Sequence, residues 1–288
     1  MWGPRLKPYH EATRAIMPER FVEIDGQRIH ATRSGQGRPL LLLHGLTASH
    51  YSFRHLAPLL EDDFEVITID LNGFGLTERP RREEHYRLEH QADLIARVLD
   101  TFGIGECDVL AHSYGATVAA TLAKQHAFRV GKLVFVSPAS AFDRMPWYVH
   151  IAPGKELFFR LAHLLLSDPK RYRRIAGRAF HVEGSFTEAD AEVYRSYLLV
   201  EGLRSAWYGF FRSMRDPAFP GCAYDHLDHP VLVLAGEHDV VVPLWKCENL
   251  VGRLRRAQFE VIPDCGHSAP EEVPSEVAAR VRRFLAEG

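Results

Sequence analysis

The segment Ala111-His112-Ser113-Tyr114-Gly115 follows the apolar run 107–110 and precedes the run 116–123, whose composition favours a helix. This order predicts a sharp turn from a strand into a helix, with the hydroxyl of Ser113 projecting out of the fold at its apex. Such a turn strains the backbone of its central residue, and only small side chains fit two residues before and after it. Ala111 and Gly115 meet that requirement. We therefore interpret the segment as carrying a nucleophile, rather than as an ordinary strand-to-helix turn.

Short apolar runs alternate with helical patterns along most of the chain. This alternation predicts a mostly parallel sheet flanked by helices, the α/β fold class. The expected strands are residues 21–24, 28–32, 40–43, 65–69, 107–110, 132–136, 231–234 and 258–262. The expected helices are residues 51–60, 88–102, 116–123, 244–254 and 275–285. Asp25-Gly26 separates the first two strands and predicts a hairpin turn there.

The alternation stops at Ser137 and resumes near residue 226. The intervening segment is rich in aromatic residues and arginine, and its pattern favours helices without strands. We therefore expect an α/β core in two parts, 1–137 and 226–288, interrupted by a helical cap at 138–225. Residues 1–20 are expected to form an N-terminal extension.

Composition limits the partners of the protein. Of 288 residues, 46% are hydrophobic, and 35 basic residues against 37 acidic ones give a net charge of −2. This balance argues against binding to nucleic acid or to an anionic membrane surface. The four cysteines form no C-x-x-C pair, and no apolar stretch approaches the roughly 18–20 residues of a transmembrane helix. We expect a cytoplasmic protein with reduced thiols.

A serine nucleophile requires a base, and the base requires an acid that fixes its tautomer. Among sixteen histidines, His267 stands out because it lies between the last expected strand and the last expected helix. That position is at the sheet edge that presents Ser113. Asp239 follows another strand end at the same edge, so we predict it as the acid. Glu237 and Asp143 are the alternatives.

Backbone amides that face the reacting oxygen are the remaining requirement of this chemistry. The helix that begins after Ser113 should supply the amide of Tyr114. The loop His44-Gly45-Leu46-Thr47 follows an expected strand and should supply a second amide, that of Leu46. We interpret His44 as a structural residue that orients this loop.

Together these motifs resemble the α/β-hydrolases that carry a helical cap. The resemblance rests on His44-Gly45, on the loop Asp70-Leu71-Asn72-Gly73-Phe74-Gly75, on the turn around Ser113, and on Asp239 and Gly266-His267. The order of nucleophile, acid and histidine is also that of the family. The match covers roughly residues 20–137 and 226–288. Ala111 stands where many members have glycine.

The resemblance implies a serine hydrolase that needs neither cofactor nor metal. Members that open epoxides or displace halide generally attack with an aspartate at the position of Ser113. Members that cleave carbon–carbon bonds often have a loop rich in glycine and proline after His-Gly, where this chain has Leu46-Thr47-Ala48-Ser49. We therefore expect hydrolysis of carboxylic esters or lactones through an acyl-enzyme. A carbon–carbon bond hydrolase, a cofactor-free haloperoxidase and a ligand-binding receptor on a hydrolase scaffold are the alternatives.

The cap should decide which substrate is accepted, because its aromatic and aliphatic residues would roof the cavity over Ser113. We expect Trp147, Phe158, Tyr194 and Trp207 to contact the substrate, a small to medium hydrophobic ester. The oligomeric state does not follow from these patterns.

Two other classes of protein agree less well with the sequence. A nicotinamide-binding fold needs G-x-G-x-x-G after its first strand, and no glycine pair in the chain continues in that way. A metal site could be read from Asp225-His226-Leu227-Asp228-His229, but Pro230 prevents a helix there. We interpret that segment as a polar linker from cap to core.

Overall fold

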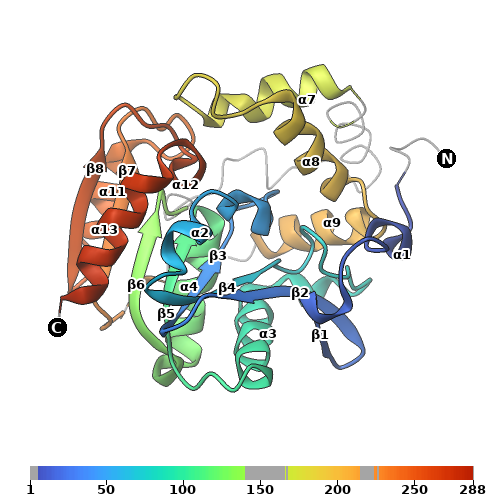
Figure 1. Cartoon of the computed structure of the whole chain (residues 1–288), viewed down its shortest axis with the longest axis horizontal. Coiled ribbons are helices and arrows are strands. Elements are labelled where there is room, and N and C mark those ends of the chain that lie inside the picture. The colour runs from blue at the N-terminus through green and yellow to red at the C-terminus, as the bar shows by residue number, and fades with distance from the viewer. Residues whose placement is uncertain (1–5, 140–165, 167, 215–223, 226, 288) are drawn as a thin grey trace.

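A sheet of eight strands forms the centre of the molecule in the computed structural model, which describes residues 6–139, 166, 168–214, 224–225 and 227–287 (Figure 1). Its strands are β1 (Phe21–Ile24), β2 (Gln27–Ser34), β3 (Arg38–Leu43), β4 (Phe64–Ile69), β5 (Cys107–His112), β6 (Val130–Val136), β7 (Val231–Gly236) and β8 (Ala257–Ile262). Their order is β1-β2-β4-β3-β5-β6-β7-β8, and the six strands from β4 to β8 are parallel. The predicted α/β class is confirmed.

The first two strands form the expected hairpin and pair with the sheet antiparallel to β4. Asp25 and Gly26 make the turn with φ of 52° and 78°. Both angles are positive, which glycine adopts freely and aspartate more readily than most residues. Ile24 then pairs with Gln27 across the turn. The Asp-Gly pair thus predicted the first connection correctly.

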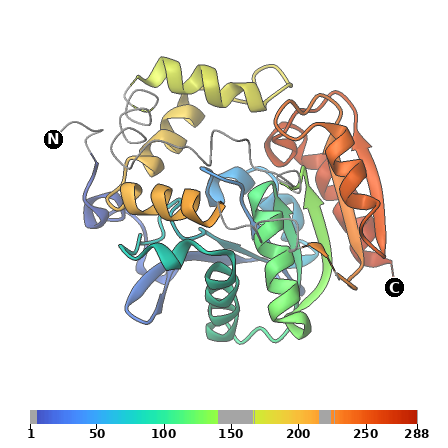
Figure 2. The same cartoon turned by 180° about the vertical axis from the view of Figure 1, so that it is seen from behind.

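Helices cover both faces of the sheet (Figures 1 and 2). One face packs against α3 (Leu88–Thr101), α4 (Tyr114–Gln125) and α11 (Leu244–Val251). The other packs against α2 (Ala57–Leu60), α12 (Ala269–Glu272) and α13 (Pro274–Ala286). Side chains of β3 alternate between the two cores, Leu41 and Leu43 facing the first, Leu40 and Leu42 the second. This period of two places consecutive residues on opposite faces of a strand.

The expected helix at 51–60 was wrong as one element. A 3₁₀ helix, η2 (His50–Phe53), is followed by the separate helix α2. Ser49 begins η2, its hydroxyl accepting a hydrogen bond from the Tyr51 amide at 3.2 Å. Pro58 lies in the first turn of α2, where its missing N–H costs nothing. Within a continuous helix the same ring would clash with the preceding turn.

The segment between β6 and β7 contributes helices in its described part, as expected. They are α7 (Pro169–Ala176), η5 (Gly177–Ala179), α8 (Glu188–Leu198) and α9 (Leu203–Met214). We refer to residues 168–214 as the cap segment. Its helices share an apolar cluster of their own, made of Leu166, Tyr172, Ala191, Tyr194, Leu198 and Leu203. Figure 1 shows α7 and α8 across the end of the sheet to which β6 points.

The N-terminal residues are bound to the cap segment. The Lys7 amide donates to the Leu199 carbonyl and the Glu201 amide donates to the Lys7 carbonyl, both at 2.8 Å. The remaining short helices are α1 (Tyr9–Ala12), η1 (Pro18–Arg20), η3 (Glu83–Tyr86) and η4 (Ala127–Arg129). None of the described helices combines the length and apolar character that crossing a membrane requires.

Gly115 provides a test of the strand-to-helix junction. A Cβ at this position would lie 2.4 Å from the Leu43 carbonyl oxygen and 2.6 Å from that of His44. Both atoms belong to the backbone, so the clash cannot be relieved by rotating a side chain. We expect Gly115→Ala to lower the free energy of unfolding in urea by about 1–3 kcal/mol. Gly105→Ala is the matched control, because a Cβ there meets nothing within 4 Å. Equal stability of the two variants would contradict this account.

Candidate active site

Ser113 occupies the junction between β5 and α4 in a strained backbone conformation. Its φ is 52° and its ψ is −118°, an arrangement that non-glycine residues rarely adopt. The Ser113 amide donates to the Val136 carbonyl at 2.9 Å, and the Ser113 carbonyl accepts from Ala116. These bonds from β6 and α4 hold the turn. Ala111, two residues before Ser113, is fully buried, so its methyl group fits within the turn.

The loops after β7 and β8 bring Asp239 and His267 together. Nδ1 of His267 lies 2.8 Å from Oδ2 of Asp239. The other carboxylate oxygen, Oδ1, accepts the amides of Val241 at 2.8 Å and Val242 at 2.7 Å. Burial is the largest influence on Asp239 and opposes its ionisation, but the hydrogen bond and charge of His267, together with bonds from the Val242 amide and the Ser137 hydroxyl, lower the pKa of the carboxyl below its usual value. A charged Asp239 can therefore stabilise a cationic His267.

Glu237 does not occupy a comparable position. Its side chain is exposed, and its carboxylate accepts a hydrogen bond from the amide of Asp264 at 3.2 Å. The third candidate acid, Asp143, lies outside the described residues. Among the described carboxylates, Asp239 is the one that contacts the imidazole of His267.

Ser113 and His267 line the same pocket, and no hydrogen bond joins these two described side chains. Hydrogen bonds of this kind are often long until a substrate is held. The neighbouring His112 helps to hold the loop after β8 that carries His267, called the histidine loop below. Nε2 of His112 donates to the His267 carbonyl at 2.9 Å. Burial, assisted by the nearby His267, lowers the pKa of His112 to about 3. His112 is thus a neutral donor, a role that the sequence analysis did not assign.

The backbone amides of Leu46 and Tyr114 are candidates for binding an oxyanion in this pocket. Leu46 and Tyr114 both line it. Neither amide donates a hydrogen bond to an acceptor within the described part of the chain. Thr47 follows Leu46 with a φ of 60°, which turns the loop after β3 sharply. Unused donors beside a serine hydroxyl are what an oxyanion requires.

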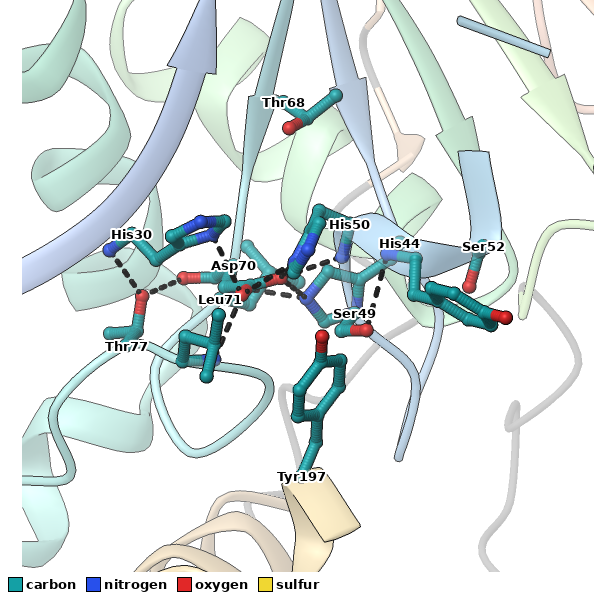
Figure 3. Close-up of polar contacts among 12 residues, drawn as sticks. His30, His44, Ser49, His50, Ser52, Thr68, Asp70, Leu71, Thr77 and Tyr197 are labelled. Atoms are coloured by element: carbon teal, nitrogen blue, oxygen red, sulfur yellow. Dashed lines mark hydrogen bonds and ion pairs between the residues drawn. The ribbon is translucent and has the colours of Figure 1, made fainter. Parts of the chain in front are cut away.

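The loop that carries Leu46 is held by His44 (Figure 3). Nε2 of His44 accepts the Leu71 amide at 3.0 Å, and its Nδ1 donates to the Gly45 carbonyl at 2.8 Å. Burial lowers the pKa of the ring, which keeps it neutral and able to accept at one nitrogen. The expected structural role of His44 agrees with these contacts.

Asp70 lies at the centre of the same network (Figure 3). Its carboxylate accepts the amides of His50 at 2.6 Å and Leu76 at 2.8 Å, as well as Nδ1 of His50 at 2.9 Å. Nδ1 of His30 is 3.0 Å away. Burial is the largest influence on Asp70 and opposes its charge, but His50 and His30 hold the pKa well below the usual range. The charged carboxylate therefore ties the loop after β3 to the loop after β4.

The pocket over Ser113 has a volume of about 360 Å³, and Tyr194, Glu271 and Ser52 are among its polar lining residues. Tyr194, from α8, donates its hydroxyl to Oε1 of Glu271 at 2.8 Å and lies 2.9 Å from the hydroxyl of Ser52. Arg54 pairs with Glu271 and, at 2.8 Å, with Asp190 of α8. Burial raises the pKa of Glu271 to about 7, although Arg54 acts in the opposite direction. This network joins the histidine loop, η2 and the cap segment.

The structure places the four predicted substrate-contacting residues in different surroundings. Tyr194 lines the pocket. Trp207 does not line it, because its half-buried ring packs against the apolar cluster of the cap segment, and Phe210, one helical turn further along α9, lines the pocket instead. Trp147 and Phe158 lie outside the described residues. A larger hollow of about 960 Å³ lies within the cap segment, and neither Ser113 nor His267 lines it.

The segment weighed as a metal site consists mainly of surface ion pairs. Asp225 pairs with Arg253 at 2.7 Å and Asp228 pairs with Arg255 at 2.9 Å. Nε2 of His229 lies 3.3 Å from the Ala127 carbonyl. His226 lies outside the described residues. These contacts agree with a polar linker between cap and core.

Comparison with known proteins defines the class. The family model for the alpha/beta hydrolase fold matches residues 38–274, so the chain belongs to this family of hydrolases. It is similar to the 2-hydroxymuconate semialdehyde hydrolase of Pseudomonas sp. (strain CF600), with 27% identity over 91% of this chain and 92% of that protein. It is also similar to the poly(3-hydroxyalkanoate) depolymerase of Ectopseudomonas oleovorans, with 29% identity over 92% of each chain. The solved epoxide hydrolase CorEH superimposes with a TM-score of 0.78 and 24% identity, over 92% of this chain and 97% of that one.

The raised pKa of Glu271 leads to a prediction about stability. A carboxyl whose pKa rises from 4.5 to about 7 on folding binds its proton more tightly in the folded state. Its stabilising contribution is complete below the unfolded pKa and is lost as the pH rises through the folded one. Glu271→Gln cannot ionise, so its Tm relative to the unmodified protein should increase by on the order of a few degrees between about pH 5 and about pH 8. A relative decrease over that range would show that Glu271 is a stabilising anion paired with Arg54.

Proposed function

We propose that the protein is a serine hydrolase that cleaves carboxylic esters or lactones. The observation that carries this proposal is the arrangement in one pocket of Ser113 on its strained turn, His267 hydrogen-bonded to Asp239, and the unused amides of Leu46 and Tyr114. Each group has the chemical type that acyl transfer requires. Positioned amides of this kind contribute about 2.7–4 kcal/mol each to stabilising an oxyanion.

The proposed mechanism has two halves. Nδ1 of His267 faces Asp239 and carries the proton of that hydrogen bond, so Nε2 is the nitrogen left to act as base. Nε2 takes the proton of Ser113 as Oγ attacks the ester carbonyl, and the amides of Leu46 and Tyr114 receive the resulting oxyanion. Collapse expels the alcohol, which takes the proton from Nε2 and leaves an acyl-enzyme. Water, deprotonated by His267, then releases the acid and restores the serine.

We further propose that residues 138–225 act as a cap that selects small to medium hydrophobic substrates. Apolar side chains such as Phe180, Ile175 and Phe210 line most of the pocket. The pair Tyr194 and Glu271 makes one end polar. A substrate with an apolar acyl chain and one hydrogen-bonding group near the ester complements this lining.

Carbon–carbon bond hydrolysis is the second candidate, because a relative is named as a 2-hydroxymuconate semialdehyde hydrolase. Epoxide opening is disfavoured by chemistry. A carboxylate nucleophile forms an ester with the opened ring, which water can hydrolyse, whereas Ser113 would form an ether that water does not cleave. The name of the depolymerase relative, whose polymer units are hydroxyalkanoates, favours ester cleavage.

We also propose that the protein works in a reducing compartment such as the cytoplasm. Cys107, Cys247 and Cys265 are buried free thiols. Burial raises the pKa of the Cys107 and Cys247 thiols to about 12, which keeps them protonated and unreactive. Among the described cysteines, none is therefore suited to redox chemistry.

Labelling with a fluorophosphonate, which reacts with activated serines, tests the proposed nucleophile. We expect one adduct by intact mass on the unmodified protein, located at Ser113, and none on Ser113→Ala. The protein should turn over p-nitrophenyl esters many times, and Ser113→Ala should lose all but a residual rate. Parallel assays with an epoxide and with a ring-fission dienoate separate the alternatives. Labelling without ester turnover, or turnover of the dienoate alone, would contradict ester hydrolysis.

The acid is tested by a pair of isosteric changes. Asp239→Asn should reduce kcat by about 10⁴-fold, because the amide favours the wrong tautomer of His267. Glu237→Gln is the control and should change kcat little, since its exposed carboxylate does not contact His267. Steady-state kinetics at one pH measure both. The opposite ranking would assign the acid to Glu237.

A further inference from the structure

Three exposed side chains with metal-binding atoms meet where the cap segment joins the core. His181 follows η5 in the cap segment, His238 immediately precedes Asp239, and Asp264 follows β8 three residues before His267. One ligand atom from each of the three residues lies within 4.8 Å of the others. The residues come from three segments that are far apart in sequence, so only the tertiary structure brings them together.

The backbone around this cluster is firmly held. The buried carboxylate of Glu272 accepts the amides of His181 at 2.7 Å, Val182 at 2.9 Å and Gly266 at 3.1 Å. The amide of His238 donates to the Cys265 carbonyl at 2.8 Å. One carboxylate thus fixes the stretch of cap segment that bears His181 against the loop that bears Asp264. The backbone positions of the three residues need not change when a ligand binds.

The donor set has the chemistry of a transition-metal site. Two imidazoles and one carboxylate suit zinc and its neighbours better than calcium or magnesium, which prefer oxygen ligands. The side chain of Asp264 is 93% exposed and that of His238 is 43% exposed, so water can complete the coordination. The rings of His181 and His238 are stacked, with centroids 4.0 Å apart and planes at 26°. The lone pairs of the ring nitrogens lie in the planes of two nearly parallel rings and do not converge on one point. One of the two exposed rings must therefore rotate before both can bind the same ion.

A second cluster has the same composition and consists of His30, His50 and Asp70. It differs because its carboxylate is buried and already hydrogen-bonded. Asp70 is fully buried and already accepts two amides and Nδ1 of His50. Its charge is therefore compensated by the protein. The exposed carboxylate of Asp264 makes no hydrogen bond or close ion pair with another described residue, its nearest cationic neighbour being Nε2 of His238 at 3.9 Å. Asp264 is thus available to an external cation.

We propose that His181, His238 and Asp264 bind a divalent transition-metal ion of the zinc type. The bound ion links the cap segment to the two loops that carry the candidate acid and the candidate base. It therefore restrains the cap segment against the core from outside the pocket. The proposal depends on these three side chains and not on the reaction catalysed.

Calorimetric titration of the intact, EDTA-treated and dialysed protein with zinc chloride tests the site. We expect saturable binding that His181→Ala and Asp264→Asn each weaken by at least about tenfold, the lower bound expected even for losing an outer-shell partner. Asp264→Asn is a mild change, because Asp264 has a φ of 49° and asparagine tolerates that conformation. His126→Ala is the matched control. His126 is a partly exposed histidine paired with Asp93 at 2.8 Å, and its removal should leave the affinity unchanged.

Thermal unfolding provides a second readout. Because an ion that binds only the folded state raises Tm, zinc should stabilise the unmodified protein and His126→Ala. It should stabilise His181→Ala and Asp264→Asn much less, and circular dichroism without zinc should show all variants folded. Absence of saturable binding to the unmodified protein would overturn the proposal. Binding that survives both His181→Ala and Asp264→Asn would overturn it as well, since the ion would then occupy other residues.

Discussion

The site depends on one close approach, that of the first turn of α4 to the end of β3. Gly115 makes this possible, because a side chain there would overlap the carbonyl oxygens of Leu43 and His44. The approach places the amide of Tyr114 in the same pocket as the loop containing Leu46. Ser113, the residue that precedes α4, has a positive φ at the same junction. The packing of the two elements holds the strained backbone of Ser113 in a pocket that Leu46 and Tyr114 also line.

Three buried carboxyl groups around the pocket hold its loops, and the influences that set their pKa values differ. Asp70 remains charged because amides and histidines surround it. Asp239 remains charged because it bonds to His267. Glu271 has a pKa near 7 because burial outweighs its pairing with Arg54. The loops around the pocket are thus held by carboxylates whose pKa values differ.

The comparisons define the fold, whereas the reaction has to be inferred from the residues of the site. Relatives that this chain covers over most of their length are named for different hydrolytic reactions, so the fold by itself does not identify the reaction. In this chain the residue at the strand-to-helix turn is Ser113, which lines the pocket with His267. The cap segment adds Tyr194 and Phe210 to the pocket. Part of the pocket lining thus comes from the segment inserted between β6 and β7.

The sequence by itself determined the alternation of strands and helices, the turn around Ser113 and the loops bearing Asp239 and His267, since these follow from local patterns and from topology. It did not reveal that His112 supports the histidine loop or that Trp207 packs within the cap segment. Those facts, like the convergence of His181 with two distant loops, depend on how remote segments pack. Contacts between distant residues leave no periodic trace in a single sequence, so only the tertiary structure could decide them.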